Sequence, residues 1–433
     1  MYAELVEHER TGRPIRVAVV GAGGSMGQGI AWQLGHTPGF RLVAAVDIDL
    51  ARARRAAELH GRPWTEPRTL SELRRALMKG QTVVAEDIRP VLDEGRNAVD
   101  VLVESTNTVA FAARVVEQAL RNGIDVVLMN AEVDCLLGWW LHHLANASGA
   151  VVTSDAGDQH GVLVRMMDEI RVWGFEIVMA GNIKGFLDRY ATPESIAEEA
   201  RKRNLSPVMC AAYTDGTKLN IEMALVANAT GLVPAKPGML GPRARHVSDV
   251  FTLFDFWSLR NPGVVDYILG AEPGGGVFVV GYCDDPTQQA YLRYYKMGDG
   301  PFYLFYRPYH LCHLETPVAI ATATLHRKPI LAPLPRPVAD AIAFAKTDLL
   351  PGTRIHRGIG SEHVYGLVLR HKEAEAADGV PVCLLDQEEA PVVLRRRIPR
   401  DTMLTWEDVA FEDTDLLKAH RRQRDLLRLP QMA

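Results

Sequence analysis

A glycine-rich turn near the N-terminus follows a short apolar run and precedes a stretch with helical periodicity. The run Val17–Val20 predicts a buried strand, and residues 21–27 read Gly-Ala-Gly-Gly-Ser-Met-Gly. A second apolar run, Leu42–Val46, is followed at once by Asp47. A strand, a glycine turn, a helix and a strand that ends in an acid are typical of a dinucleotide-binding unit. We therefore expect an α/β domain that binds a nicotinamide cofactor for hydride transfer.

Each glycine of the turn has an expected task. Gly21 makes the tight turn, Gly23 allows the backbone to approach the pyrophosphate, and Gly27 allows the helix to pack closely on the strand. Free backbone N–H groups at the helix start face the negative charge of the phosphates. The expected cofactor-binding residues of the turn are Gly21, Gly23, Gly24, Ser25, Met26 and Gly27.

Asp47 and the arginines that follow it leave the choice between NAD and NADP open. An acid at this position hydrogen-bonds the ribose hydroxyls of NAD and repels a 2′-phosphate. Arg52, Arg54 and Arg55 follow within two helical turns, either to hold that phosphate or to form a solvated helix face. The turn is also one residue longer than the strict GxGxxG spacing.

The chain of 433 residues is too long for one ordinary core, and its pattern changes twice. Strands and helices alternate through residues 1–154, which predicts a doubly wound parallel sheet of Rossmann type. Residues 155–335 predict an α+β substrate domain, and residues 336–433, which follow a proline-rich boundary, predict a mostly β domain. Predicted strands are Val17–Val20, Leu42–Val46, Thr82–Val84, Val99–Glu104, Asp125–Met129, Ala150–Thr153, Gly174–Met179, Val277–Tyr282 and Phe302–Tyr306, and predicted central helices are Val162–Glu169, Thr192–Asn204 and Lys218–Ala229.

Composition excludes several classes of partner. The net charge is −5 with 23% charged residues, and no basic patch indicates binding to nucleic acid or to a membrane surface. No apolar run reaches the length of about 18 residues that a membrane span needs. Five widely spaced cysteines without a CxxC pair indicate reduced thiols, so we expect a cytoplasmic protein. The expected partners are a small-molecule substrate and further copies of the same chain in a homo-oligomer.

Polar residues follow two predicted strands of the first domain. Glu104, Ser105 and Thr106 come after Val99–Val103, and Asn130 and Glu132 come after the next strand. The carboxyl ends of parallel strands form the ligand crevice, so Glu104, Ser105, Thr106 and Asn130 are expected beside the nicotinamide and Glu132 near the substrate. The alternative for Asn130 and Glu132 is turn and helix-cap chemistry.

A segment with two carboxylates and a histidine lies between the first two domains. Asp155, Asp158 and His160 could hold Mg²⁺ or Mn²⁺, or transfer a proton near the substrate. Helix capping is the alternative for the acids. A divalent cation is therefore one open possibility.

The strongest catalytic candidates lie around residue 218. Lys218 opens a predicted helix, where the dipole disfavours a cation, so a task such as polarising a carbonyl is indicated. Glu222 follows one turn later and Asn220 lies on another face, while Asp215 and Lys184 are nearby candidates for proton transfer or charge stabilisation. Surface salt bridges are the alternative for the lysines.

The segment Tyr306–Pro317 gathers a cation, aromatic rings and histidines. Arg307 could hold a carboxylate or phosphate group with two parallel hydrogen bonds. His310 could move a proton near neutral pH, although single histidines are more often structural.

These motifs resemble known families. The turn at residues 21–27, Glu104-Ser105-Thr106 and Asn130-Ala131-Glu132 resemble the nucleotide domain of homoserine dehydrogenases. Residues 155–161, 181–190 and 215–222 resemble the deoxyxylulose-phosphate reductoisomerase-like proteins, and residues 346–352 and 398–409 are similar to motifs of their C-terminal SAF domain. Homoserine dehydrogenases have a lysine where this chain has Glu132, which argues against homoserine as the substrate.

The resemblance implies an NAD(P)-dependent oxidoreductase. Lys218, Asn220 and Glu222 would face the substrate, with Lys184 and Asp215 nearby, and the substrate would be a small sugar-derived, phosphorylated carbonyl compound such as deoxyxylulose 5-phosphate. The chain shows no clear counterpart of the metal-binding acids of true reductoisomerases, which leaves the rearrangement step open. Two alternatives are a plain dehydrogenase of a sugar acid or polyol and a sensor or scaffold that binds NAD(P) without turnover.

Overall fold

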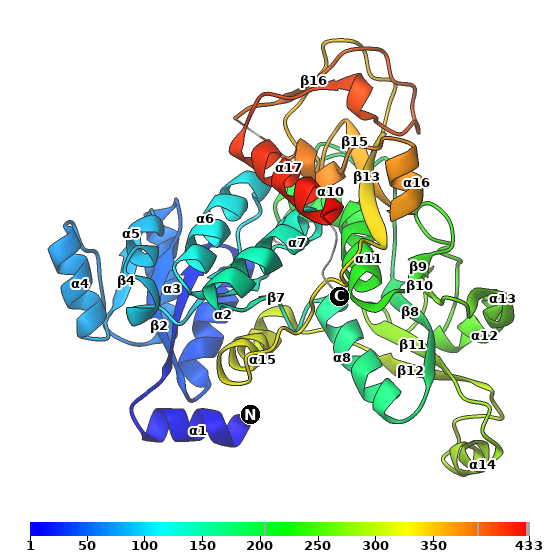
Figure 1. Cartoon of the computed structure of the whole chain (residues 1–433), viewed down its shortest axis with the longest axis horizontal. Coiled ribbons are helices and arrows are strands. Elements are labelled where there is room, and N and C mark those ends of the chain that lie inside the picture. The colour runs from blue at the N-terminus through cyan, green and yellow to red at the C-terminus, as the bar shows by residue number, and fades with distance from the viewer. Residues whose placement is uncertain (203–204, 388, 430–433) are drawn as a thin grey trace. The chain divides into compact units, whose positions relative to one another are not determined.

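The computed structural model of the chain describes residues 1–202, 205–387 and 389–429, and it contains two compact units (Figure 1). The first comprises Met1–Gly161, Leu311–Ala332 and the segment from Ala419, and the second comprises Val162–His310 and Pro333–Lys418. This division differs from the three consecutive domains expected from the sequence. The difference arises because residues 311–332 and the segment from Ala419 lie late in the chain but belong to the first unit.

The first unit is built on a parallel sheet of seven strands, which confirms the predicted α/β class. The strand order is β3-β4-β2-β1-β5-β6-β7. Its strands are apolar almost throughout because a parallel sheet is buried on both faces. The strands are β1 Ile15–Val20, β2 Phe40–Val46, β3 Trp64–Thr65, β4 Thr82–Ala85, β5 Val101–Glu104, β6 Asp125–Leu128 and β7 Val152–Ser154.

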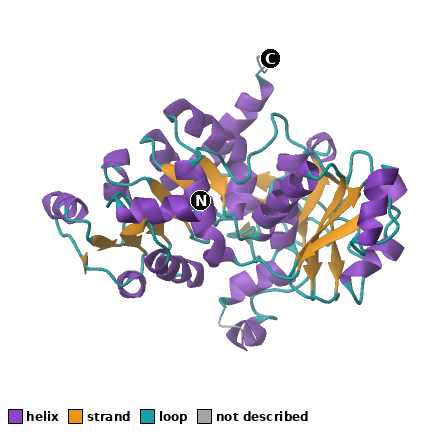
Figure 2. Cartoon of the chain, turned by 90° about the horizontal axis from the view of Figure 1, so that it is seen from below, coloured by secondary structure: helices purple, strands orange, loops and turns teal. Residues whose placement is uncertain are grey.

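Helices pack along these strands (Figure 2). One of them, α15, comes from late in the chain, yet its Ala319, Ile320 and Ala321 belong to the same core as Val17 and Ile30. Small side chains on α15 allow this close packing, so residues 311–332 belong to the first unit. The helices are α1 Tyr2–Arg10, α2 Ser25–His36, α3 Leu50–His60, α4 Leu70–Met78, α5 Arg89–Leu92, α6 Val109–Arg121, α7 Ala131–Ser148 and α15 Cys312–Leu325.

The second unit contains a mixed sheet in the order β12-β11-β8-β10-β9. Strands β8, β10 and β9 run parallel, whereas β11 is antiparallel to both β8 and β12. The strands are β8 Glu176–Lys184, β9 Val233–Pro234, β10 Val264–Leu269, β11 Val277–Tyr282 and β12 Phe302–Arg307, and the helices are α8 Gln159–Val172, α9 Ala197–Lys202, α10 Pro207–Thr214, α11 Thr217–Thr230, α12 Val250–Leu253, α13 Phe256–Leu259 and α14 Pro286–Tyr294.

The C-terminal segment of the second unit consists of short strands that pack on α11. Thr217 Oγ1 accepts a hydrogen bond from Gly366 N at 2.9 Å, and Asn220 Oδ1 accepts one from Val368 N at 2.9 Å. These bonds join the segment to the central part of the chain. Its elements are β13 Ala339–Ala345, β14 Arg354–Ile355, β15 Val364–Arg370, α16 His371–Ala376, β16 Val392–Leu394 and β17 Val409–Ala410. Helix α17 Asp415–Arg428 follows, and from Ala419 onward it belongs to the first unit.

One predicted helix is shorter than expected. Within the expected range 192–204, α9 begins only at Ala197. Thr192 and Ser195 exchange hydrogen bonds in the turn before it, since Ser195 N donates to Thr192 Oγ1 at 3.1 Å and Thr192 N donates to Ser195 Oγ at 2.9 Å. Residues 203–204, where the expected helix ends, lie outside the described residues.

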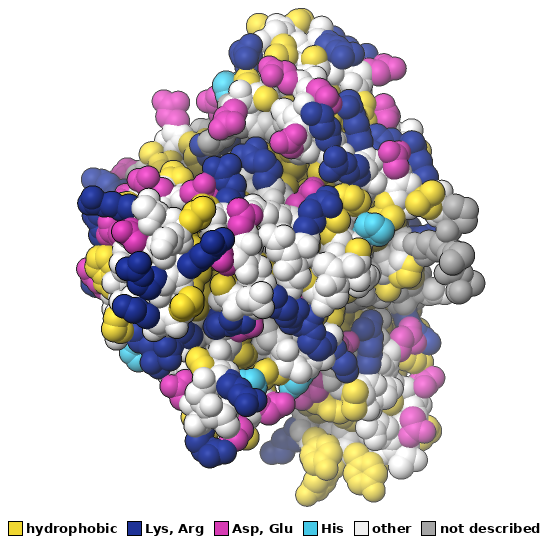
Figure 3. Space-filling view, turned by 60° about the vertical axis from the view of Figure 1, so that its left-hand side comes forward, with side chains coloured by type: hydrophobic (Ala, Val, Ile, Leu, Met, Phe, Trp, Pro, Cys, Tyr) yellow, Lys and Arg dark blue, Asp and Glu magenta, His cyan; other side chains and the backbone are white. Residues whose placement is uncertain are grey.

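The surface carries charges of both signs. On the face drawn in Figure 3, Lys and Arg side chains are interspersed with Asp and Glu side chains. In the described part of the chain, every helix is too short or too polar to cross a membrane.

Candidate functional site

The glycine turn of the first unit is a tight backbone cradle at the start of α2. Gly24 is the N-cap of α2, so Ser25 and Met26 lie in its first turn. A Cβ atom on Gly27 would lie 2.2 Å from the Gly21 carbonyl oxygen, and one on Gly23 would lie 2.4 Å from the Arg52 Cβ. Such distances leave space for glycine alone, as expected for a turn that holds a pyrophosphate.

Asp47 and Arg52 flank this turn. Gly23 N donates a hydrogen bond to Asp47 Oδ2 at 2.9 Å, and Asp49 N donates to Asp47 Oδ1 at 3.0 Å. Arg52 lies against Gly23 through its Cβ and forms an exposed ion pair with Asp49 at 3.3 Å. Arg54 is paired with Glu66, with Arg54 Nη2 2.8 Å from Glu66 Oε2.

The strand end after β5 lies against the same turn. Ser105 Oγ donates to the Val20 carbonyl at 2.8 Å, and Thr106 N donates to Glu104 Oε1 at 3.0 Å. Glu104 is completely buried, and burial raises the pKa of its carboxyl group to about 8. Its second oxygen, Oε2, has no hydrogen-bond partner within the described residues. A protonated carboxyl group with an unused polar atom beside a glycine cradle fits a nicotinamide dinucleotide.

Asn130 and Glu132 lie at the start of α7. Asn130 is the N-cap, and its Oδ1 accepts a hydrogen bond from Val133 N at 3.1 Å. The Asn130 side chain also contacts the Thr108 carbonyl at 3.4 Å. Helix capping, the alternative considered from the sequence, therefore describes Asn130, and Glu132 is buried in the first turn of the same helix.

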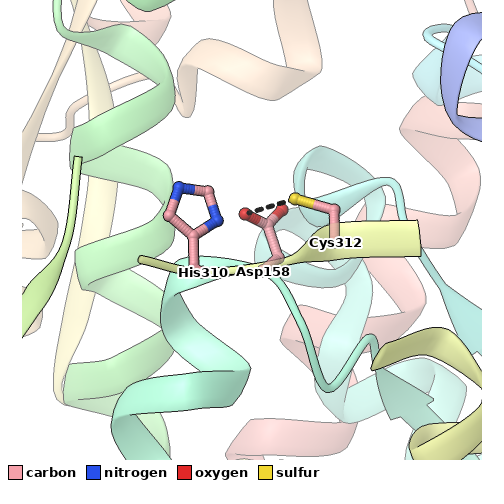
Figure 4. A group of neighbouring side chains, drawn as sticks. All are labelled: Asp158, His310 and Cys312. Carbon is pink, nitrogen blue, oxygen red and sulfur yellow. Dashed lines mark hydrogen bonds between the residues drawn. The ribbon is translucent and has the colours of Figure 1, made fainter. Parts of the chain in front are cut away.

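Asp155 is a buried residue in the turn before α8, and its predicted role near the substrate stays a prediction. It accepts hydrogen bonds from Gly157 N at 2.7 Å and from Asp158 N at 3.2 Å, and burial raises the pKa of its carboxyl group to about 7. The side chains of Asp158 and Cys312 face each other, with Cys312 Sγ 3.9 Å from Asp158 Oδ1 (Figure 4). Cys312 was not predicted, because its partner lies 154 residues away in the chain. His310, drawn in the same view, is the last residue of its segment of the second unit.

In the second unit the catalytic candidates are concentrated in the first two turns of α11. This helix begins at Thr217, and the side chains of Lys218, Asn220 and Glu222 are buried. Only 5% of Lys218 and 1% of Glu222 is exposed, and the two residues are one helical turn apart. Asn220 Nδ2 donates to the Gly216 carbonyl at 2.8 Å, and its Oδ1 accepts a hydrogen bond from Val368 N of β15, so both polar groups bind the backbone and the expected substrate contact stays a prediction.

Asp215 also has a structural partner. Its Oδ2 accepts a hydrogen bond from Lys346 Nζ at 2.8 Å, and Thr217 N donates to its Oδ1 at 2.7 Å. Burial raises the pKa of this carboxyl group to about 6 despite the lysine. Lys346 lies 131 residues further along the chain, so sequence spacing gave no sign of this pair.

Lys184 and Arg307 lie at the same end of the mixed sheet. Lys184 is the last residue of β8 and Arg307 the last of β12. Val277 of β11 pairs with both Asn182 and Arg307, so the register places both cations at the same end of the sheet. The Arg307 guanidinium stacks over the Tyr309 ring at 4.7 Å.

Two family models match consecutive regions of the chain. Residues 23–153 match the family model described as homoserine dehydrogenase, NAD binding domain. Residues 157–316 match the model described as oxidoreductase DRL, catalytic domain. A comparison with curated proteins gives no match.

Several solved structures are distantly similar. A 1-deoxy-D-xylulose 5-phosphate reductoisomerase from Zymomonas mobilis, in complex with NADPH, is 17% identical over 48% of this chain and 57% of its own, with a TM-score of 0.34. The match therefore spans little more than half of that enzyme. A hyperthermophilic archaeal homoserine dehydrogenase, also with NADPH, is 13% identical over 72% of this chain and 98% of its own, with a TM-score of 0.41.

The family matches confirm the expected resemblance, whereas the SAF-like character of the C-terminal segment stays a prediction. The matches meet between residues 153 and 157, close to the boundary expected at residue 154. The chain therefore joins a region similar to the NAD-binding domain of homoserine dehydrogenases to a region similar to the catalytic domain of DRL oxidoreductases.

Proposed function

We propose that the protein uses NAD(P)H to reduce the carbonyl group of a small, sugar-derived, phosphorylated substrate, with deoxyxylulose 5-phosphate as the first compound to test. When bound, the cofactor supplies the hydride that adds to the carbonyl carbon. The carbonyl oxygen takes up one proton, and the products are an alcohol and oxidised cofactor. A rearrangement of the sugar carbon chain before this reduction would use a divalent cation.

The observation that carries the proposal is the buried lysine at the start of α11. A lysine in the first turn of a helix is disfavoured by the dipole, and burial of a charged residue that is only 5% exposed carries a desolvation cost. Neither feature stabilises the helix. A buried positive charge is, however, well suited to polarise a carbonyl and to stabilise the alkoxide that develops during reduction. We assign this role to Lys218.

Two further side chains complete the proposed chemistry in the second unit. Glu222, one turn after Lys218, would hold a substrate hydroxyl group or move its proton. Arg307, at the same end of the sheet as Lys184, would bind the phosphate group of the substrate, because its guanidinium offers two parallel donors.

The decisive experiment measures NADPH and NADH oxidation by the purified full-length chain with deoxyxylulose 5-phosphate, with Mg²⁺, with Mn²⁺ and after chelation. We expect oxidation that is lost on chelation and restored by one of the two cations. Absence of oxidation in every condition would overturn the proposed substrate.

A second assay separates the alternatives. A panel of sugar acids and polyols is offered with NAD⁺ and NADP⁺. Reduction of either cofactor with one member would indicate a plain dehydrogenase without rearrangement. Tight binding of the cofactor without turnover in either assay would indicate a sensor.

A further inference from the structure

We propose that Lys346 and Asp401, two residues of the C-terminal β segment, position the substrate-facing parts of the second unit. The parts are the loop 185–191, which follows Lys184, and the start of α11. The role of these two residues in turnover rests on the proposed function. Neither residue would touch the substrate, and both would act through the segments that they hold.

Lys346 joins three separate segments of the second unit. Its Nζ donates to Asp215 Oδ2 at 2.8 Å, to the Ala191 carbonyl at 2.6 Å and to the Ser361 carbonyl at 2.5 Å. An ammonium group has three N–H donors, so these bonds use all of them. The Lys346 side chain is 1% exposed and that of Asp215 is completely buried. Lys346 thus ties the end of the loop to Asp215, which lies two residues before the start of α11.

Asp401 holds the same loop from a second point. Its Oδ2 accepts a hydrogen bond from Tyr190 Oη at 2.9 Å, and its Oδ1 accepts one from Tyr365 Oη at 2.9 Å. Tyr190 is the loop residue next to the one that Lys346 binds. Asp401 N donates to the Ala345 carbonyl at 2.9 Å, so the backbone beside Lys346 and the backbone of Asp401 are joined.

The backbone conformation of Asp401 would suit glycine better than aspartate, which indicates that the side chain of Asp401 has a role of its own. Its φ angle is 59°, in the left-handed region that glycine and, less readily, aspartate and asparagine adopt. A glycine would fit this backbone with less strain. The carboxylate, which binds two tyrosines, is what glycine would lose.

The loop and the start of α11 also contact each other directly. Asp188 N donates to the Thr214 carbonyl at 2.8 Å, one residue before Asp215. The loop follows Lys184 directly, and Asp215 lies three residues before Lys218. A shift of either segment therefore displaces a proposed substrate-facing lysine, and displacements near 1 Å are enough to slow catalysis strongly.

The first test removes one hydroxyl group. In Tyr190→Phe we expect faster amide hydrogen exchange at residues 185–191 and a kcat that falls about tenfold, because a misplaced catalytic group loses rate. The Kd for NADPH and the melting temperature should stay unchanged. Tyr294→Phe, on the exposed surface of α14, is the matched control and should change none of these. Unchanged exchange and unchanged kcat in Tyr190→Phe would overturn the role of Asp401.

Asp401→Gly tests the same contact without backbone strain. It should reproduce the exchange pattern of Tyr190→Phe, and Asp401→Asn, which keeps one carbonyl acceptor, should restore part of the protection. Exchange in Asp401→Gly equal to that of the wild type would contradict the proposal.

The second test addresses Lys346. Lys346→Met leaves the Asp215 carboxylate buried without its partner, so this variant is compared with the double variant Lys346→Met/Asp215→Asn, which buries no charge. If the single variant does not fold, the double variant carries the test. We expect the double variant to fold, to bind NADPH normally, and to show faster exchange at both 185–191 and 214–220. Protection of both segments at the wild-type level would overturn the positioning role.

Hydrogen exchange needs no substrate, which separates the two proposals. If the wild-type chain does not oxidise NADPH with deoxyxylulose 5-phosphate, the proposed substrate is wrong. The exchange pattern of the variants would still decide whether the C-terminal segment orders the loop and α11.

Discussion

Thr106 donates its backbone N–H to Glu104 Oε1 at 3.0 Å, although burial raises the pKa of that carboxyl group to about 8. The hydrogen bonds from the backbone and side chain of Thr106 stabilise the charged form less than burial destabilises it. At neutral pH, Glu104 is therefore mainly protonated in the folded chain and ionised in the unfolded chain.

This difference predicts a pH dependence of stability. The folded state keeps a proton that the unfolded chain releases above its ordinary pKa near 4.5. The contribution of Glu104 to the free energy of unfolding is thus fully present below that pH, falls as the pH rises to about 8, and levels off above it. Melting temperatures between pH 5 and pH 9 should show a smaller decline for Glu104→Gln than for the wild type. Parallel curves for the two proteins would contradict the assignment.

Gly27→Ala should abolish cofactor binding. The added Cβ would lie 2.2 Å from the Gly21 carbonyl oxygen, so the turn must open or the helix must move away from the strand. We expect the Kd for NADPH, measured by fluorescence titration, to rise by at least about a hundredfold, since both the cradle and the helix N-terminus lose their geometry. Gly274→Ala, whose Cβ would meet its nearest neighbour at 3.8 Å, is the control and should bind normally.

Arg52→Ala tests the choice between the two cofactors. Arg52 lies beside the turn and close to Asp47, in reach of a 2′-phosphate. If it binds that group, its loss removes a charged contact of about 1.5–3 kcal/mol, which raises the Kd for NADPH more than tenfold and leaves the Kd for NADH unchanged. Arg55→Ala on the same helix is the control, since Arg55 pairs with Glu58. An equal effect on both cofactors would rule out a contact with the phosphate.

Lys218→Ala should separate chemistry from cofactor binding. Loss of the charge that stabilises the developing alkoxide should lower kcat by about a hundredfold to a thousandfold, the range found for the removal of one stabilising group. The Kd for NADPH should not change, because the cofactor turn belongs to the other unit. A comparable rise in Kd with kcat unchanged would assign Lys218 to cofactor binding instead.

Asn228→Ala should destabilise the second unit. Asn228 Oδ1 accepts hydrogen bonds from Val338 N at 2.8 Å and Ala339 N at 3.0 Å, and its Nδ2 donates to the Ala339 carbonyl at 2.9 Å. Three lost hydrogen bonds at about 1 kcal/mol each lower the free energy of unfolding by about 3 kcal/mol. Chemical denaturation measures this loss, and Asn146→Ala, at an exposed position of α7, should change stability by less than about 0.5 kcal/mol.

The first unit could be predicted from the sequence largely because its signals are local. Six of its seven strands coincide with predicted apolar runs, since strands buried on both faces are continuously hydrophobic. The seventh, β3, has two residues and carries no periodicity.

Strand β10 of the second unit was not predicted, for another reason. Asp266 interrupts its apolar pattern, and that carboxylate is buried because Leu240 N and Gly241 N donate to it.

The candidate site could be predicted only where its residues lie close together in the sequence. The glycine turn and its acid lie within 27 residues, and Lys218 and Glu222 share one helix. The partners of Asp215 and Asn220 lie far along the chain, so the sequence could not show that Lys346 and β15 occupy their polar atoms. A motif alone therefore predicts a substrate contact weakly, because a group from a distant part of the chain can bind the same polar side chain.

The placement of α15 and Gln423 has a consequence for synthesis. Helix α15 supplies part of the core around the parallel sheet, and Gln423 accepts a hydrogen bond from Trp140 N at 3.0 Å and donates one to the Leu136 carbonyl at 2.7 Å. A nascent chain that has emerged only through β7 lacks both. Domains generally fold in the order in which they leave the ribosome. Here the nucleotide-binding unit starts first and is completed last, so a chain halted before residue 312 would display an unfilled apolar surface to chaperones and proteases.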